Sequence, residues 1–323
     1  MLLSVIILIA GLALVVFGAD WLVDGASSIA RRSGISEFVI GLTIVGFGTS
    51  CPELVVSLTG AFAQNSDIAI GNVIGSNIFN TLLILGITAV IMPITVTKAN
   101  LRRDIPITFA VTLLLIGAGL SHSLFGLGET DALTRIDGAI FLAVFALYTW
   151  SCFKFDDKSA DTSSEVPEKS YGIAASIGLV LAGLAGLVIG GRLFVNSATD
   201  IARLIGVSDK FIAITVLAGG TSLPELATCV VAAAKKKGQL ALGNILGSNV
   251  FNILLILGCA SLVHPVSFAD IDFIDVGVVL ASVVIVWLGA LLSPRSGRRI
   301  GRLSGAVMLL AFAAYYYHLF INI

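Results

Sequence analysis

Charged residues are scarce in this sequence. Of its 323 residues only 12% are charged, whereas 57% are hydrophobic, and the mean hydropathy is +1.03. Soluble domains contain roughly 25% charged and 45–50% apolar residues, so this shortage of charge excludes a water-soluble chain. The net charge is −1, and nothing in the charge pattern suggests nucleic acid as a partner.

Motifs of catalysis and of transition-metal binding are missing too. The sequence has three histidines and four cysteines, with no paired histidines and no HExxH, GxSxG or CxxC spacing. We therefore predict that the protein is not an enzyme and that it has no zinc site, disulfide framework or cofactor. The cysteines are interpreted as small packing residues, and His122, His264 and His318 as interfacial residues near the ends of spans.

Long apolar segments are abundant by contrast. Ten of them approach or exceed the roughly 20 residues that cross a bilayer. The first has no basic residue before it, so we expect a span and not a signal peptide. Gly138–Phe153 is short and can begin earlier. The sequence predicts an all-α integral membrane protein whose ten transmembrane helices contact the lipid bilayer, at Leu2–Val23, Phe38–Ala63, Ile68–Met92, Ile105–Leu124, Gly138–Phe153, Gly172–Val195, Phe211–Ala234, Leu240–Val263, Phe273–Leu292 and Leu303–Phe320.

Lysine and arginine divide unequally between the two sides that these spans define. Fifteen fall on one side, and only Arg135, Arg192, Arg203 and Lys210 fall on the other. Because cytoplasmic loops carry the excess of basic residues, the richer side is predicted to be cytoplasmic. Both termini are then outside, which fits an even number of spans.

The sequence also repeats itself. At an offset of 172 residues Gly41–Gly86 aligns without a gap with Ala213–Gly258, and 21 of the 46 positions are identical. Five predicted spans separate a residue from its copy, so the two copies cross the membrane in opposite directions. We predict two inverted five-helix repeats, 1–153 and 171–323, joined by a polar cytoplasmic linker, 154–170. Inverted repeats are typical of secondary transporters with a site near the bilayer midplane.

Each repeat carries one glutamate deep in a predicted span, Glu53 in GTSCPE (48–53) and Glu225 in GTSLPE (220–225). An ionisable side chain at the bilayer centre costs roughly 2.5–3.5 kcal/mol, so both should face the protein interior and meet a cation or a proton. The preceding prolines, Pro52 and Pro224, should kink each helix and free carbonyl oxygens. Carboxylate and carbonyl oxygens are ligands of hard cations such as Ca²⁺. The two glutamates are therefore predicted to form one shared cation site.

A second pair of polar segments follows, GSNIFN (75–80) and GSNVFN (247–252). In each segment a serine and an asparagine are four residues apart, on one helix face, where their neutral oxygens suit a monovalent ion. Small residues and amides also pack membrane helices together. That alternative stays open for Gly71, Gly75, Asn72 and Asn77, and carries less weight for Asn80 and Asn252.

The paired motifs resemble those of the Ca²⁺:cation antiporters, which include the sodium/calcium exchangers, and in particular their short bacterial and archaeal members. The resemblance implies the sodium/calcium exchanger fold, Ca²⁺ and Na⁺ as transported ions, location in a prokaryotic inner membrane, and sliding of 2–23 and 172–195 past a fixed core. It implies a Ca²⁺ site at Glu53, Glu225 and the backbone oxygens of Thr49 and Thr221. The implied Na⁺ ligands are both glutamates, Ser50, Ser222, Ser76, Ser248, Asn80, Asn252 and the carbonyls of Gly46 and Ala218.

One position departs from part of that family. Some members, notably in the potassium-dependent branch, carry aspartate where this chain has Asn252. With asparagine at both Asn80 and Asn252 the site keeps only two acids, which argues against potassium dependence and leaves the number of Na⁺ ions open.

The predicted function is secondary active antiport of Na⁺ against Ca²⁺ by alternating access. H⁺/Ca²⁺ exchange, or exchange of another divalent cation, stays open because burial favours the protonated form of a carboxyl group. A channel would not need doubled, proline-broken carboxylate motifs. All predicted ligands lie in one chain, so a monomer is sufficient for transport, although the oligomeric state does not follow from the sequence.

Overall fold

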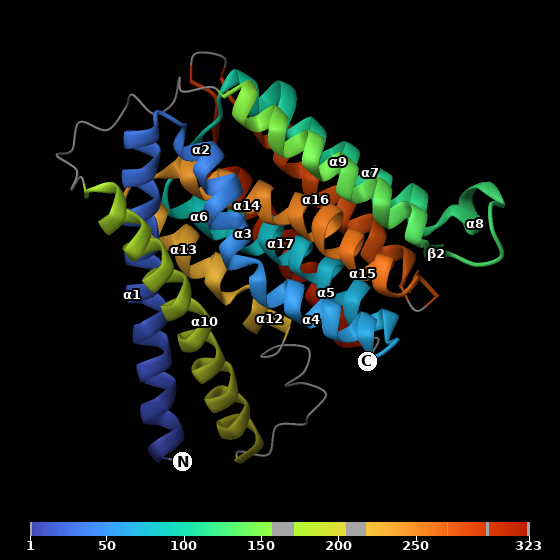
Figure 1. Cartoon of the computed structure of the whole chain (residues 1–323), viewed down its shortest axis with the longest axis horizontal. Coiled ribbons are helices and arrows are strands. Elements are labelled where there is room, and N and C mark those ends of the chain that lie inside the picture. The colour runs from blue at the N-terminus through green and yellow to red at the C-terminus, as the bar shows by residue number, and fades with distance from the viewer. Residues whose placement is uncertain (1, 157–170, 205–217, 270, 295–296, 322–323) are drawn as a thin grey trace.

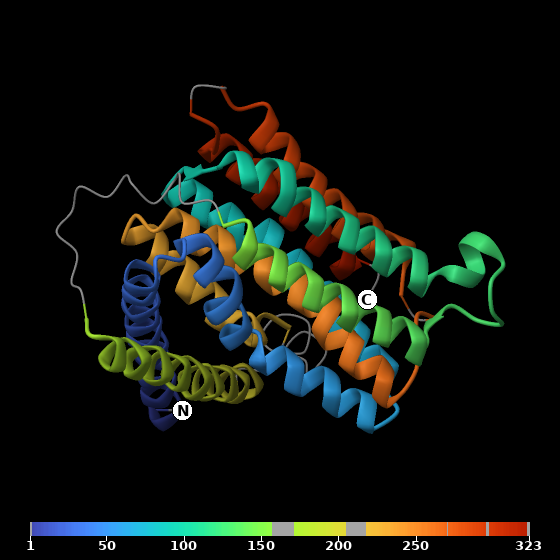
Figure 2. The same ribbon diagram turned by 45° about the horizontal axis from the view of Figure 1, so that its top comes forward.

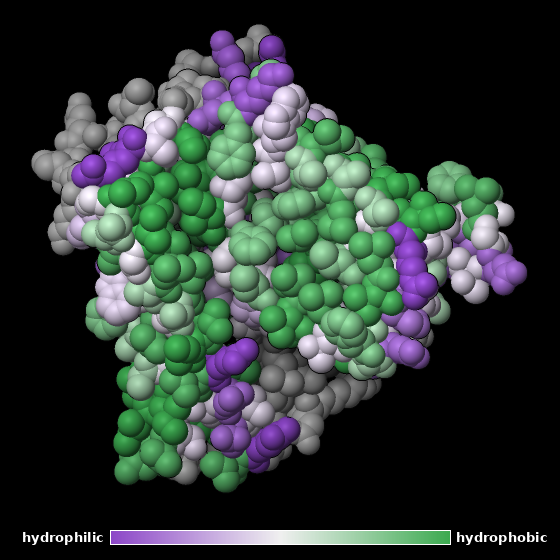
Figure 3. All heavy atoms as spheres, in the orientation of Figure 1, coloured by the Kyte–Doolittle hydropathy of each residue, from purple (hydrophilic) through white to green (hydrophobic). Residues whose placement is uncertain are grey.

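The computed structural model describes residues 2–156, 171–204, 218–269, 271–294 and 297–321, and these are mostly helical. Within these residues, seven helices are long and apolar enough to cross a membrane, or eight if the bent series Glu37–Thr49 and Cys51–Phe62 is one span. Hydrophobic residues cover most of the face shown in Figure 3. The chain is therefore a multi-pass membrane protein.

Most helices of the first half lie where the apolar segments predicted them, but the predicted span Ile105–Leu124 begins earlier, at Asn100, and its continuous helix ends at Gly119. α1 continues past the predicted end at Val23. α9 begins before Gly138 because Thr134 and Asp137 form a capping box at its start. The elements are α1 (Leu2–Ser33), α2 (Glu37–Ile40), η1 (Gly41–Val45), α3 (Gly46–Thr49), α4 (Cys51–Phe62), α5 (Ser66–Ile78), η2 (Phe79–Ile84), α6 (Leu85–Ile91), β1 (Ile94–Thr95), η3 (Asn100–Asp104), α7 (Ile105–Gly119), α8 (Ser121–Phe125), β2 (Ala132–Leu133) and α9 (Arg135–Lys154), where η marks a π-helical segment.

The second half has a corresponding order of elements. The start of the predicted span Phe211–Ala234 and most of the predicted linker 154–170 lie outside the described residues. The ten spans and the two-repeat arrangement therefore stay predictions. The described elements are α10 (Ile173–Leu204), α12 (Ala218–Thr221), α13 (Leu223–Ala234), α14 (Gly238–Val250), η6 (Phe251–Ile256), α15 (Leu257–Val263), β3 (Val266–Ser267), α16 (Phe273–Leu291), β4 (Arg299–Ile300) and α17 (Arg302–Ile321).

Both glutamate motifs lie at breaks between helices. Helices α3 and α4 meet at Ser50, where the chain bends by 48°. Pro52 follows as one of the first two residues of α4, where its missing N–H leaves no gap in the helix. Ser222 and Pro224 have the same places between α12 and α13. The expected kink is therefore present in the first span, and the second motif also lies at a helix break; the freed carbonyl oxygens stay a prediction.

Helices α1 and α10 run side by side and cross the remaining bundle as a pair (Figures 1 and 2). Glycines allow this close approach, as is common between membrane helices. A Cβ atom added to Gly11, Gly18, Gly183 or Gly190 would lie 2.7–2.8 Å from a backbone atom of the other helix. Helices α1 and α10 are thus closely packed against each other.

Helix α14 forms the centre of the remaining bundle, and all its residues from Gln239 to Val250 are buried. It contacts α2 and η1 so closely that a Cβ on Gly243 would lie 2.1 Å from the Phe38 carbonyl oxygen. Two short antiparallel pairs, β1 with β4 and β2 with β3, join the two halves outside the helices. The core therefore draws on both halves of the sequence.

Candidate functional site

The two glutamates of the repeated motif are completely buried. Glu53 lies in the first turn of α4 and Glu225 in the first turn of α13, and each is 0% exposed. None of the ion pairs formed by the described residues includes either of them. Their positions at helix N-termini favour negative charge, but only by about 0.3–2 kcal/mol. Two buried carboxyl groups thus lack a basic partner.

Serine hydroxyls connect each motif with the glutamate of the other half. Ser50 Oγ donates to Glu225 Oε1 at 2.9 Å, and Ser222 Oγ donates to Glu53 Oε1 at 3.2 Å. Ser76, from α5, also donates to Glu53 Oε1, at 3.5 Å. The structure therefore brings both helix breaks and both glutamates to one place in the interior.

The asparagines of the second repeated segment also cross between the halves. Asn80 Nδ2 donates to Asn249 Oδ1 at 3.3 Å, and Asn252 Nδ2 donates to Asn77 Oδ1 at 3.0 Å. Asn80 belongs to η2 and Asn252 to η6, and such wide helical turns are frequent at functional sites. Because the amide nitrogens make these bonds, both side-chain carbonyl oxygens remain available.

Five buried oxygen atoms of the predicted ligands have no hydrogen-bond partner among the described residues. A buried polar atom without a partner costs about 1–3 kcal/mol, and more if it is charged. Carboxylate, amide and hydroxyl oxygens are the ligands that hard cations prefer, and neither sulfur nor imidazole is in the set. The atoms are Glu53 Oε2, Glu225 Oε2, Asn80 Oδ1, Asn252 Oδ1 and Ser248 Oγ.

The remaining predicted ligands are backbone oxygens, and their surroundings differ from one to the next. The Gly46 carbonyl already accepts from Ser50 N at 3.1 Å and from Thr49 Oγ1 at 3.4 Å. Thr221 lines a neighbouring cavity. Ala218 begins α12, directly after residues that the structure does not describe. These backbone oxygens remain predicted ligands.

Four further asparagines position the site, a role that the sequence interpretation left open or missed. Besides Asn77 and Asn249, Asn72 Nδ2 donates to the Glu53 carbonyl at 3.1 Å and to Ser57 Oγ at 2.9 Å. In the other half, Asn244 Nδ2 donates to Cys229 Sγ at 3.2 Å, and Thr49 Oγ1 donates to Asn244 Oδ1 at 3.2 Å. The repeat itself was the signal, because each of these asparagines occurs in both halves.

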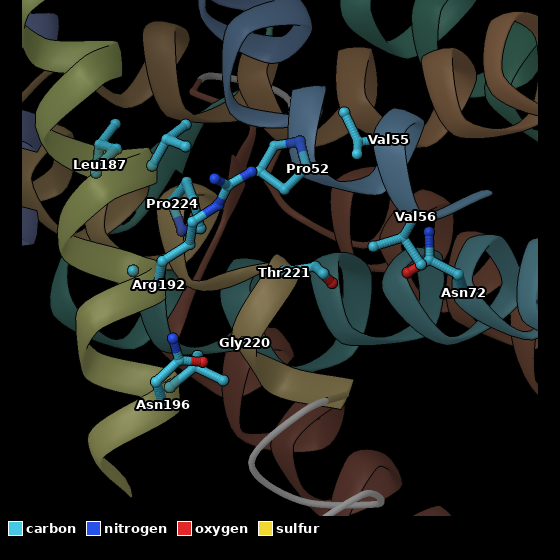
Figure 4. Close-up of a pocket in the computed structure, with 13 residues that line it drawn as sticks. Pro52, Val55, Val56, Asn72, Leu187, Arg192, Asn196, Gly220, Thr221 and Pro224 are labelled. Atoms are coloured by element: carbon cyan, nitrogen blue, oxygen red, sulfur yellow. The ribbon is translucent and has the colours of Figure 1, made fainter. Parts of the chain in front are cut away.

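A cavity of about 350 Å³ lies beside the glutamates, between α10 and the two helix breaks (Figure 4). Its walls include Pro52 and Pro224, each adjacent in sequence to a glutamate, together with Asn72 and Thr221. Arg192 lines it from the side of α10. The cavity therefore borders residues next to both glutamates, although the glutamate side chains themselves are fully buried.

Comparisons with known proteins agree on one family. The family described as sodium/calcium exchanger protein matches residues 3–154 and 175–321. The protein CaxA of Alkalimonas amylolytica is 41% identical over 99% of both chains. The inner membrane protein YrbG of Escherichia coli is 36% identical over 93% of both chains. The sodium/calcium exchanger MaX1 of Methanosarcina acetivorans is 33% identical over 98% of both chains.

Solved structures of the sodium-calcium exchanger NCX_Mj share this fold. The structure soaked with zero Na⁺ and Ca²⁺ has a TM-score of 0.82 and 33% sequence identity, and the match covers 98% of this chain and 99% of that chain. The structure soaked with 10 mM Na⁺ and zero Ca²⁺ has a TM-score of 0.83 at 33% identity, with 98% of each chain covered. The chain therefore belongs to the sodium/calcium exchanger family, in the prokaryotic branch of the Ca²⁺:cation antiporters.

Proposed function

We propose that this protein exchanges Na⁺ for Ca²⁺ across the membrane by alternating access, and that Glu53 and Glu225 form the cation site that both ions share. The observation that carries this proposal is that five of the ten buried, unpartnered side-chain oxygens of the described residues belong to the predicted ligands. Membership of the exchanger family supports Ca²⁺/cation antiport. The proposal adds the coupling ion and the residues.

Charge balance favours a divalent ion between the glutamates. Two carboxylates carry two negative charges, and burying them without a counter-charge costs several kcal/mol each. A bound Ca²⁺ neutralises both and accepts six to eight oxygen ligands, which the glutamates, nearby hydroxyls, carbonyls and water can supply. Na⁺ ions bound at the Asn80, Asn252 and Ser248 oxygens would draw on the same carboxylates. Because one pair of glutamates serves both ions, occupation by one excludes the other, which is the basis of antiport.

The proposed topology has ten spans in two inverted repeats, with both termini outside. Support comes from the unequal distribution of basic residues and from hydrogen bonds that recur at the same 172-residue offset, such as Ser50 to Glu225 and Ser222 to Glu53. One chain contains all proposed ligands, so a monomer suffices. The name of the relative YrbG as an inner membrane protein supports the same location here.

The test is uptake of radiolabelled Ca²⁺ into proteoliposomes of the purified protein. Vesicles loaded with Na⁺ are diluted into Na⁺-free buffer, and parallel samples carry only an outward H⁺ gradient or no gradient, with the membrane potential clamped by K⁺ and valinomycin. We expect uptake driven by Na⁺ and not by H⁺. Uptake driven by H⁺ alone would identify an H⁺/Ca²⁺ exchanger.

Matched variants test the site. Glu53→Gln and Glu225→Gln keep the shape of the side chain and remove one charge each, so both should abolish exchange. Glu129→Gln is the control, because it makes the same change at an exposed position in the loop before α9. Wild-type exchange by either site variant would disprove the assignment of the shared glutamates.

A further inference from the structure

One arginine lies in the cavity beside the candidate site. Arg192 of α10 lines this cavity with Pro52, Thr221 and Pro224. In Figure 4 its side chain extends from α10 toward Pro52. Among the residues that the structure describes, Arg192 forms neither a hydrogen bond nor an ion pair. An unpaired positive charge therefore lies in a cavity whose walls include the residues next to both glutamates.

The corresponding position in the first half has the opposite charge. The 172-residue offset pairs Arg192 with Asp20 and Asn196 with Asp24. The two aspartates flank Lys235, whose Nζ lies 2.6 Å from Asp20 Oδ1 and 2.5 Å from Asp24 Oδ1. That cluster keeps one net negative charge. The two halves thus have equivalent glutamates but differ in charge at these corresponding positions.

We propose that Arg192 is a specificity-determining residue that weakens the binding of external cations, and weakens Ca²⁺ binding more than Na⁺ binding. This inference rests on the proposed function and topology, which place Arg192 on the outer side and Asp20 with Asp24 on the cytoplasmic side. The guanidinium repels any cation in the cavity, whereas the net negative cluster attracts cations to the neighbourhood of Asp20 and Asp24. External Ca²⁺ is thereby kept from rebinding after release.

The ratio of the two effects follows from charge alone. Coulomb energy is proportional to the charge of the ion, so a change in Arg192 that alters Na⁺ binding by a given factor alters Ca²⁺ binding by the square of that factor. This holds for any distance and local dielectric constant that the two ions share, as they do where both pass through the same cavity or bind to the same glutamates. A contribution of Arg192 through packing would not produce this relation.

The experiment measures half-saturating concentrations of external Ca²⁺ and external Na⁺ in right-side-out membrane vesicles that contain the protein. Arg192→Gln should lower the Na⁺ value by about twofold and the Ca²⁺ value by about fourfold, for a repulsion typical of water-filled sites. Arg192→Lys should match the wild type. Arg135→Gln should also match it, because this exposed arginine lies at the start of α9, away from the cavity.

Two more changes extend the series. Arg192→Asp copies the first half and doubles the change in charge, so it should shift the values by about fourfold for Na⁺ and about sixteenfold for Ca²⁺. Asn196→Asp adds a negative charge to the same cavity without altering Arg192, and should shift both values in the same direction. It serves as the test if an Arg192 variant fails to insert. Higher ionic strength should reduce every shift.

Equal factors for the two ions, a similar shift in Arg192→Lys, or unchanged values in Arg192→Gln and Asn196→Asp would each overturn the inference. The two proposals can fail separately. If wild-type vesicles show no Na⁺-dependent Ca²⁺ transport, the proposed function fails; if wild type and variants all exchange with the same half-saturating values, only the role of Arg192 fails.

Discussion

Replacing Ser50 by alanine removes one of the two hydroxyls that connect the halves at the glutamates. In the structure this hydroxyl donates to Glu225 Oε1 at 2.9 Å, and Ser222 makes the equivalent bond to Glu53 Oε1 at 3.2 Å. A hydrogen bond to a charged group contributes about 1.5–3 kcal/mol. Glu53 keeps a second, longer bond from Ser76 at 3.5 Å. Ser50→Ala should therefore cost more than Ser222→Ala.

The expected effect is a weaker Ca²⁺ site in a folded protein. A loss of 1.4 kcal/mol raises a dissociation constant tenfold. Because a bound ion itself holds the carboxylates in place, we expect about tenfold for Ser50→Ala, near the lower end of the energy range. For Ser222→Ala we expect a smaller loss of about 1 kcal/mol, or about fivefold, since Ser76 still donates to Glu53 Oε1. Radiolabelled Ca²⁺ exchange in proteoliposomes gives the half-saturating concentration, and size-exclusion chromatography confirms that each variant is folded.

Ser33→Ala is the matched control for this pair. The Ser33 hydroxyl donates at 2.7 Å to the Ile29 carbonyl of its own helix and lies at an exposed position, so its loss should leave Ca²⁺ binding unchanged. A folded Ser50→Ala protein with a half-saturating Ca²⁺ concentration within twofold of the wild type would refute the argument. It would mean that the bond between the halves does not orient Glu225 for an ion.

Three shorter predictions address the surroundings of the site. Asn77→Ala removes the acceptor that holds the Asn252 amide at 3.0 Å, so the half-saturating Na⁺ concentration should rise about fivefold, with a smaller change for Ca²⁺. Gly243→Ala would place Cβ 2.1 Å from the Phe38 carbonyl oxygen. It should therefore destabilise the protein by about 1–3 kcal/mol in thermal unfolding. Gly178→Ala is the control and should not destabilise it, because a Cβ there meets no described atom within 4 Å. Ca²⁺ at 100 times its dissociation constant should stabilise the folded protein by about 2.7 kcal/mol, and a chelator should reverse this.

Hydropathy predicted most helices because the bilayer imposes a minimum length of apolar sequence. It was less successful where a helix continues into polar sequence. The first turn of α9 contains Arg135 and Asp137, so hydropathy predicts a start at Gly138, although the capping box with Thr134 determines the boundary. Helix α1 likewise continues to Ser33, beyond the apolar segment.

The repeat predicted which residues belong together, but not how they pair. Alignment of GTSCPE with GTSLPE identified both glutamates and both serines, yet Ser50 contacts Glu225 and not Glu53. That choice depends on how the two helix breaks face each other, which no local pattern encodes. The sequence also does not predict the wide turns that carry Asn80 and Asn252.

The asparagines show how a ligand role can be distinguished from helix packing. An amide that only joins helices would use its nitrogen and its oxygen, since an unpaired buried oxygen costs about 1–3 kcal/mol. Asn249 does so: its nitrogen bonds Thr81 and its oxygen accepts from Asn80. Asn80 and Asn252 use only the nitrogen and leave a buried oxygen unpartnered among the described residues. The energetic cost of an unpartnered buried oxygen thus occurs at corresponding positions of both halves, at Asn80 and Asn252. It also occurs at Glu53 and Glu225. Bound cations would offset these costs in both halves, whereas packing or a single misplaced side chain would not produce the same unpartnered oxygens twice.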